Sequence, residues 1–112
     1  MIGTRLGLLL SVEQAAAEAH KWIDKALELK PDDFYILDSM GWVLYRLGRL
    51  DEAVEYLRRA RELRDDPEVA AHLGEVLWVM GDKDGARDVW ESALKTTPDD
   101  ETILNVIERL GP

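Results

Sequence analysis

Apolar residues recur every three or four positions along most of the chain, which is the spacing of one face of an α-helix. This spacing is clearest between Phe34 and Leu47, where it predicts one helix. The apolar positions there are Ile36, Leu37, Met40, Val43, Leu44 and Leu47. A second helix is predicted from about Asp51 to Leu63, with Ala53, Val54, Leu57 and Ala60 on successive turns. A strand would need alternating apolar and polar residues, so the pattern predicts helix pairs and no sheet.

Residues suited to helix ends stand at the limits of these segments. The stretches "KPDDF", "DDPEV" and "TPDDE" each place an aspartate before a predicted helix, where its side chain can accept hydrogen bonds from free backbone N–H groups. Ser11 and Gln14 have the spacing of a capping box at the start of another helix. Gly48 and Gly81 follow apolar segments and are predicted to end them.

The helix pairs repeat along the chain. Leu6-Gly7, Met40-Gly41 and Leu73-Gly74 recur at intervals of 34 and then 33 residues. Two alanine columns keep the same intervals, namely Ala19, Ala53, Ala86 and Ala26, Ala60, Ala93. We therefore predict one domain, residues 1–112, built from units of about 1–33, 34–66 and 67–100 and a last helix over 101–110. The first helix of the first unit is incomplete, and the last helix would cap the stack.

These columns resemble the tetratricopeptide repeat family, whose pattern is a Leu-Gly pair, a turn glycine, then Glu-Ala, a bulky residue, Ala and a closing Pro. In the second unit the matching residues are Leu37, Met40, Gly41, Leu44, Gly48, Leu50, Glu52, Ala53, Leu57 and Ala60. In the third unit they are Leu73, Gly74, Leu77, Gly81, Ala86, Trp90, Ala93 and Pro98. In the first unit they are Leu6, Gly7, Leu10, Ala19, Ile23, Ala26 and Pro31. Asp65 and Gln14 depart from the pattern, standing where the closing Pro and the turn Gly are usual. The resemblance implies an all-α fold, an α-solenoid of stacked antiparallel helix pairs.

A narrower resemblance concerns "LDSMGWVLYRLGRLDEAVEYLRRA" and "AAHLGEVLWVMGD". These stretches are similar to the C-terminal repeats of bacterial envelope lipoproteins that act as scaffolds for a carboxyl-terminal processing protease. The similarity implies a bacterial periplasmic or envelope location, with an envelope protease or its substrate as partner. The residues themselves do not encode a compartment.

The family resemblance also implies a ligand site, because first helices of such repeats line a concave groove. The stripe that would face it comprises Tyr35, Asp38, Trp42, Tyr45 and Arg46, then Ala71, Glu75 and Trp78, then Asn105 and Arg109. Trp42, Tyr45 and Trp78 would cluster there as aromatic anchors, and the carboxylates would favour a basic group of the ligand. The alternative is that Trp42 and Trp78 pack between repeats. Trp22 and Trp90 are predicted to lie in the core.

Charge and composition narrow the partners. The 112 residues carry a formal net charge of −9, which disfavours nucleic acid as a partner because phosphate contacts need clustered Lys and Arg. No apolar run approaches the about 20 residues that a membrane span needs, so we expect no membrane insertion. The chain has no cysteine, and His20 and His72 lack metal-ligand partners at motif spacing. We expect no metal, no cofactor and no enzyme activity.

Two functions remain. The first is an adaptor or scaffold that binds a peptide or helix of another protein in the groove. The second is a structural spacer or a self-associating unit, in which Leu6, Leu8, Leu9 and Leu10 of the incomplete first repeat are covered by a second copy to form a homodimer.

Overall fold

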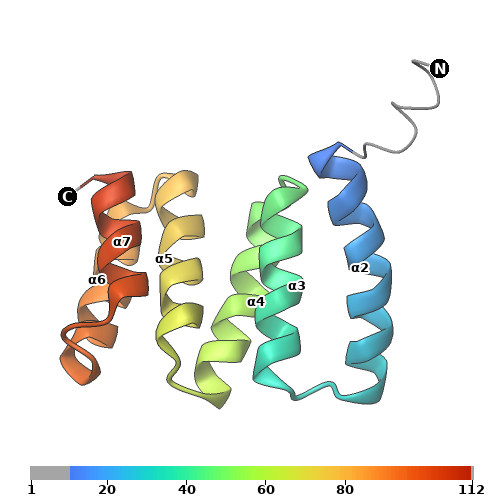
Figure 1. Cartoon of the computed structure of the whole chain (residues 1–112), viewed down its shortest axis with the longest axis horizontal. Coiled ribbons are helices and arrows are strands. Elements are labelled where there is room, and N and C mark those ends of the chain that lie inside the picture. Colours follow the sequence, from blue (N-terminus) through green and yellow to red (C-terminus); the bar gives the residue numbers. More distant parts are fainter. Residues whose placement is uncertain (1–10, 112) are drawn as a thin grey trace.

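The computed structural model describes residues 11–111, which form helices joined by short loops (Figure 1). The helices are α2 (Val12–Leu29), α3 (Phe34–Arg46), α4 (Leu50–Leu63), α5 (Pro67–Met80), α6 (Lys83–Thr96) and α7 (Glu101–Leu110). No strand is found among the described residues, so the prediction of an all-α solenoid is confirmed. The division into repeats stays a prediction, and its Leu6 to Leu10 part lies outside the described residues.

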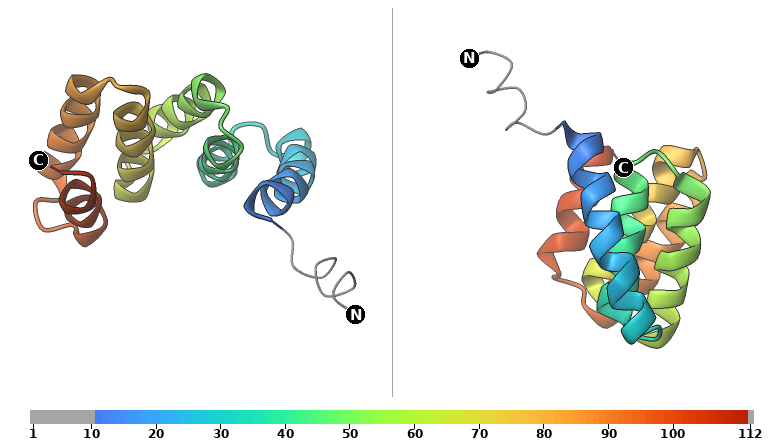
Figure 2. Two further views of the ribbon diagram at one scale, coloured as in Figure 1. Left: turned by 90° about the horizontal axis from the view of Figure 1, so that it is seen from above. Right: turned by 90° about the vertical axis from the view of Figure 1, so that its right-hand side faces the viewer.

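The helices form two layers. Helices α3, α5 and α7 lie side by side in one layer, and α4 and α6 form the other (Figure 2). Helices α2 to α6 each pack mainly against their neighbours in the chain, whereas α7 packs mainly against α5, which also contacts α3. The layer of α3, α5 and α7 therefore brings together residues that are about one repeat apart in the sequence.

The predicted end signals operate as expected. Asp33, Asp66 and Asp100 each accept hydrogen bonds from backbone N–H groups at the start of α3, α5 and α7. Ser11 and Gln14 form the reciprocal capping box at the start of α2. Gly48 and Gly81 have φ of 79° and 97°, a left-handed conformation that glycine adopts without the steric penalty of a Cβ atom. Local chemistry thus defines the helix limits.

The core lies between the two layers. Leu37, Met40 and Leu44 of α3 are almost fully buried, as is Leu57 of α4. Gly41 lets α3 approach α4, since a Cβ there would lie 2.5 Å from Cγ of Leu57 and 3.2 Å from the carbonyl of Ala53. A tryptophan occupies the corresponding place between α5 and α6. The atoms nearest a Cβ on Gly74 belong to the indole of Trp90.

The two tryptophans predicted to lie in the core have different environments. Trp90 is 2% exposed, which confirms its prediction. Trp22 is 67% exposed, so its prediction was wrong. Ile23, one position along, packs against the core instead, and the two side chains diverge by about 100° around the helix axis. The indole of Trp22 lies on the outer face of α2, where the ammonium of Lys25 is 5.2 Å from its ring centroid.

None of the helices in the described part of the chain is both long and apolar enough to cross a bilayer.

Candidate functional site

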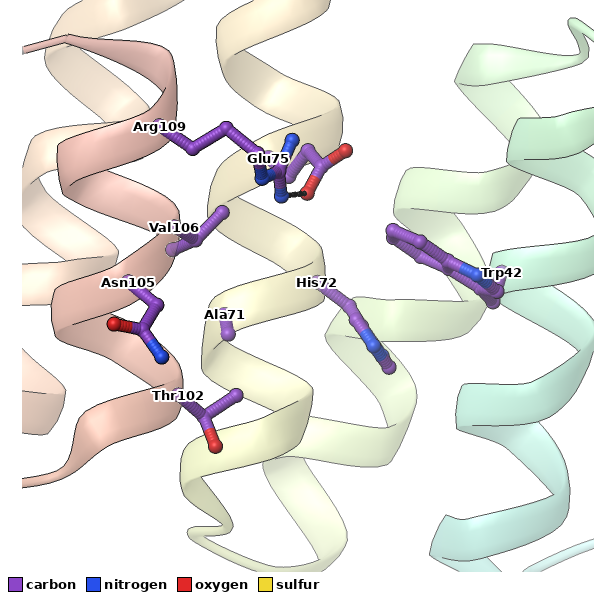
Figure 3. Close-up of a pocket in the computed structure, with 8 residues that line it drawn as sticks. All are labelled: Trp42, Ala71, His72, Glu75, Thr102, Asn105, Val106 and Arg109. Atoms are coloured by element: carbon purple, nitrogen blue, oxygen red, sulfur yellow. Dashed lines mark hydrogen bonds and ion pairs between the residues drawn. The ribbon is translucent and has the colours of Figure 1, made fainter.

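A pocket of about 280 Å³ opens between α3, α5 and α7, and we call it the α3/α5/α7 pocket (Figure 3). Its lining residues are Trp42, Ala71, His72, Glu75, Thr102, Asn105, Val106 and Arg109. A larger hollow, of about 490 Å³, is lined only by residues of α2 and is a depression along one helix. Because three helices contribute to the α3/α5/α7 pocket, its shape depends on the stacking of the repeats.

Glu75 links the three helices at one side of the pocket. Its side chain is nearly buried, and one carboxylate oxygen accepts a hydrogen bond of 3.0 Å from the hydroxyl of Tyr45 on α3. The other oxygen accepts one from the guanidinium of Arg109 on α7, as the dashed line in Figure 3 marks. A buried carboxylate needs such partners, and charge-assisted hydrogen bonds are the strong ones. The charge of Glu75 is therefore satisfied within the protein.

This network changes the acid–base behaviour of its members. Burial raises the pKa of the Tyr45 phenol, and the hydrogen bond to Glu75 and the negative charge of Glu75 raise that pKa further. The hydrogen bond to Glu75 also raises the pKa of the Arg109 guanidinium, which keeps it charged. Both effects favour the protonated donors that Glu75 requires.

The opposite wall of the pocket is an aromatic and acidic cluster. The ring of Trp42 stacks on that of His72 at 4.2 Å between centroids, with an angle of 27° between the planes. The Nδ1 atom of His72 lies 2.8 Å from a carboxylate oxygen of Asp38, which is 6% exposed. Tyr45 also contacts Trp42, at 5.0 Å between centroids. Trp42 thus lines the pocket and also packs against His72 of α5, and its role as a ligand anchor stays a prediction.

The structure separates the predicted groove residues into groups. Trp42, Ala71, Glu75, Asn105 and Arg109 line the α3/α5/α7 pocket. Asp38 and Tyr45 stand behind it, joined to His72 and Glu75 by hydrogen bonds. The exposed side chains of Tyr35 and Arg46 do not line the pocket.

Trp78 is the main correction, because it does not cluster with Trp42 and Tyr45. Its ring is 5.7 Å from that of Trp90 on α6, between centroids, and it does not line the pocket. The cations of Lys83 and Arg87 lie over the ring at 4.9 and 5.4 Å. Cation–π attraction and stacking on Trp90 therefore hold Trp78 toward the start of α6 rather than toward α3.

Sequence reasoning did not place His72 or Val106 in the site. The sequence showed no metal-ligand partner of His72 at motif spacing, and in the structure its side chain has a hydrogen-bond partner, Asp38. The feature of the sequence that could have indicated this contact is the separation of the two residues by 34 positions, which is one repeat length. A metal ligand set was not expected either, although oxygen or nitrogen donors of Asp38, Glu68 and His72 lie within 4.8 Å of one another.

Comparison with known proteins adds the family context. Residues 39–101 match a family described as tetratricopeptide repeat. A "TPR repeat-containing protein" of Pseudomonas aeruginosa is 59% identical over 58 residues, which is 52% of this chain and 10% of that protein. Human "Tetratricopeptide repeat protein 7A" is 36% identical over 90 residues, or 80% of this chain and 10% of that protein. Human "Protein arginine N-methyltransferase 9" is 49% identical over 43 residues, 38% of this chain and 5% of that protein. The chain thus spans about a tenth or less of the length of these relatives.

Proposed function

Because the chain belongs to the tetratricopeptide repeat family, whose members commonly bind other proteins, we propose that it is an adaptor that binds a partner's peptide or helix. The α3/α5/α7 pocket is the binding site in this proposal. The family is generally non-catalytic, and we infer that this chain has no enzyme activity of its own.

The observation that carries the proposal is a pocket whose walls suit an amphipathic ligand. Trp42 offers an aromatic surface against which an apolar side chain can be buried. Thr102 and Asn105 are exposed on α7 and can exchange hydrogen bonds with a peptide backbone. The side chain of Arg109 is 58% exposed and keeps N–H donors beyond the one bound to Glu75.

The sequence suggested a ligand with a basic group, but the pocket favours a ligand of different charge. Glu75 already pairs with Arg109, and Asp38 pairs with His72. Neither carboxylate stands free to attract a basic group. We therefore propose a ligand with an apolar anchor residue flanked by backbone or carboxylate acceptors for Asn105 and Arg109.

A peptide selection would test the site. Peptides are selected from a random display library on the wild-type domain, and their affinities are then measured by fluorescence anisotropy. We expect Trp42→Ala and Asn105→Ala each to weaken the selected peptides at least tenfold, since residues at the centre of an interface carry most of its binding energy. Asn105 is exposed, so its truncation leaves the fold intact.

Two matched variants control this experiment. Glu108→Ala changes another exposed residue of α7 that does not line the pocket, and Trp22→Ala removes an exposed tryptophan from α2. Both should bind like the wild type. Peptides that bind all four variants equally would contradict the proposed site, and circular dichroism of each variant shows whether the fold is kept.

The finer identity of the partner is a separate proposal. The resemblance to repeats of bacterial envelope scaffolds favours an envelope protease or one of its substrates. Cross-linking in a bacterial envelope extract, with wild type and Asn105→Ala compared, would test it. Capture of a protease or its substrate by the wild type alone is the expected result, and equal capture by both would oppose it.

A second candidate function is self-association, and exposed apolar residues on α2 favour it. Trp22 and Leu29 are 67% and 84% exposed on this helix, which packs mainly against α3. A second copy covering this surface would form a homodimer. Sedimentation at increasing protein concentration distinguishes self-association from the adaptor function, since a mass that stays monomeric would oppose self-association.

A further inference from the structure

Asp38, Glu68 and His72 bring three potential metal ligands together beside the α3/α5/α7 pocket. One donor atom of each lies within 4.8 Å of the donors of the other two. We propose that these residues bind a divalent transition-metal ion, with Zn²⁺ as the preferred ion. The inference does not depend on the proposed binding of a peptide.

Two of the ligands come from one turn of one helix. Glu68 and His72 are four residues apart on α5, so their side chains stand on the same face, one above the other. This separation is also that of the two histidines in the helical zinc motif HExxH, where one turn brings two ligands to one ion. The exposed side chain of Glu68 can rotate to supply the third ligand beside Asp38 and His72.

Asp38 and His72 are already oriented toward one another. Asp38 is 6% exposed on α3, and its oxygen lies 2.8 Å from Nδ1 of His72. The stack on Trp42 fixes the plane of the imidazole. A tetrahedral ion with bonds of about 2.0–2.1 Å needs a nitrogen and an oxygen about 3.4 Å apart. The pair therefore has to open by only about half an ångström to admit the ion.

The donor set points to the class of ion. Imidazole nitrogen with carboxylate oxygen suits Zn²⁺, whereas Mg²⁺ and Ca²⁺ prefer oxygen ligands alone. Three protein ligands leave a coordination position for water or for a side chain of a bound partner. Binding through Nδ1 requires that nitrogen to give up any proton it carries, so affinity must fall as the pH is lowered.

Such an ion would join the first helices of two successive repeats, because Asp38 belongs to α3 and both other ligands to α5. It would lie behind the ring of His72, which lines the pocket. Metal binding would then fix the spacing of the two helices that form one wall of the pocket. The shape of the ligand site would thereby depend on the ion.

Isothermal titration calorimetry of Zn²⁺ into protein without a histidine tag tests the proposal. We expect saturable binding of one ion, with Kd raised at least tenfold by Glu68→Gln and by His72→Gln, since loss of even an outer partner of a metal ligand costs 10–100-fold. Glu68 is exposed, so Glu68→Gln retains the fold. His20→Gln removes the only other histidine and should bind like the wild type.

Imidazole chemical shifts give an independent measure. In His20→Gln protein the single remaining imidazole is His72, and its resonances should shift with Zn²⁺ until one equivalent has been added. Mg²⁺ at the same concentration should leave them unchanged. Binding that survives both Glu68→Gln and His72→Gln, or the absence of saturable binding at millimolar Zn²⁺, would overturn the proposed site.

Discussion

Gly74→Ala provides a direct test of how the two layers fit together. A Cβ on Gly74 would overlap Nε1, Cε2 and Cδ1 of the Trp90 indole, at separations that real Cβ atoms do not show. Trp90 cannot easily yield, because it is 2% exposed and its other neighbours include Trp78. The added methyl group must therefore push α5 away from α6 or force Trp90 from its rotamer.

The size of the effect follows from two opposing contributions. Overpacking a core costs about 1–3 kcal/mol, and the rigid indole favours the upper end, about 3 kcal/mol. Replacing glycine by alanine within a helix returns about 1 kcal/mol of helix propensity. The net loss is about 2 kcal/mol. Unfolding entropy of about 2.1 cal/mol/K per residue, over 112 residues, converts this to a fall in Tm of about 8 °C.

Urea unfolding followed by circular dichroism measures this loss of stability. Its cause is tested by making Gly74→Ala also in a variant that lacks the indole of Trp90. Trp90→Ala removes the indole, whose atoms are the nearest to a Cβ on Gly74. In that background Gly74→Ala should be neutral or stabilise by up to about 1 kcal/mol. An equal loss in both backgrounds would refute steric overlap with Trp90 as the reason.

Three further predictions follow from the same contacts. Glu75→Gln should lower the free energy of unfolding by about 1 kcal/mol in urea titrations, because Arg109 loses its carboxylate partner. The control is Glu108→Gln on the exposed face of α7, which should leave the midpoint unchanged, and equal effects of the two variants would contradict the role of Glu75. Tyr45→Phe should flatten the loss of stability at alkaline pH. The pKa of the Tyr45 phenol is raised above 10.0 in the folded state, so protonated Tyr45 stabilises the fold at pH values below its pKa in the unfolded chain. This stabilisation is lost as the pH rises through the pKa of Tyr45 in the folded protein. A tyrosinate titration in which all three tyrosines ionise together would argue against this. Trp22→Gln should change stability by less than about 0.5 kcal/mol, since the ring is 67% exposed; a larger loss by the same measurement would mean that α2 uses it for packing.

The helices and their ends could be predicted because they depend on neighbours in the sequence. An aspartate before a helix caps it whatever the rest of the chain does, as Asp33, Asp66 and Asp100 illustrate. The two turn glycines likewise depend only on local backbone conformation. The periodic columns predicted the buried residues of α3 and the burial of Trp90, because each repeat places equivalent residues in equivalent surroundings.

The orientation of the tryptophans depends on residues that local pattern does not relate to them. Trp22 was predicted to lie in the core, yet Ile23 packs there instead, because a step of one residue turns a side chain by about 100° around the helix. Trp78 follows the groove stripe in sequence, but Lys83 and Arg87 of the next helix attract its ring. Large side chains near the edge of a stripe can turn either way, and tertiary neighbours decide between the two.

Two polar contacts of the site join residues that are one repeat length apart in the sequence. Asp38 and His72 are 34 residues apart, as are Glu75 and Arg109. The first pair joins α3 to α5 and the second joins α5 to α7, at positions about one helical turn apart in the repeating pattern. A stack of repeats is stabilised chiefly by contacts between adjacent units. Because these same pairs border the α3/α5/α7 pocket, a ligand bound there would also touch the contacts that join neighbouring helices. We predict that ligand binding and the stacking of these helices are coupled through His72, Glu75 and Arg109, which belong both to the pairs and to the pocket lining.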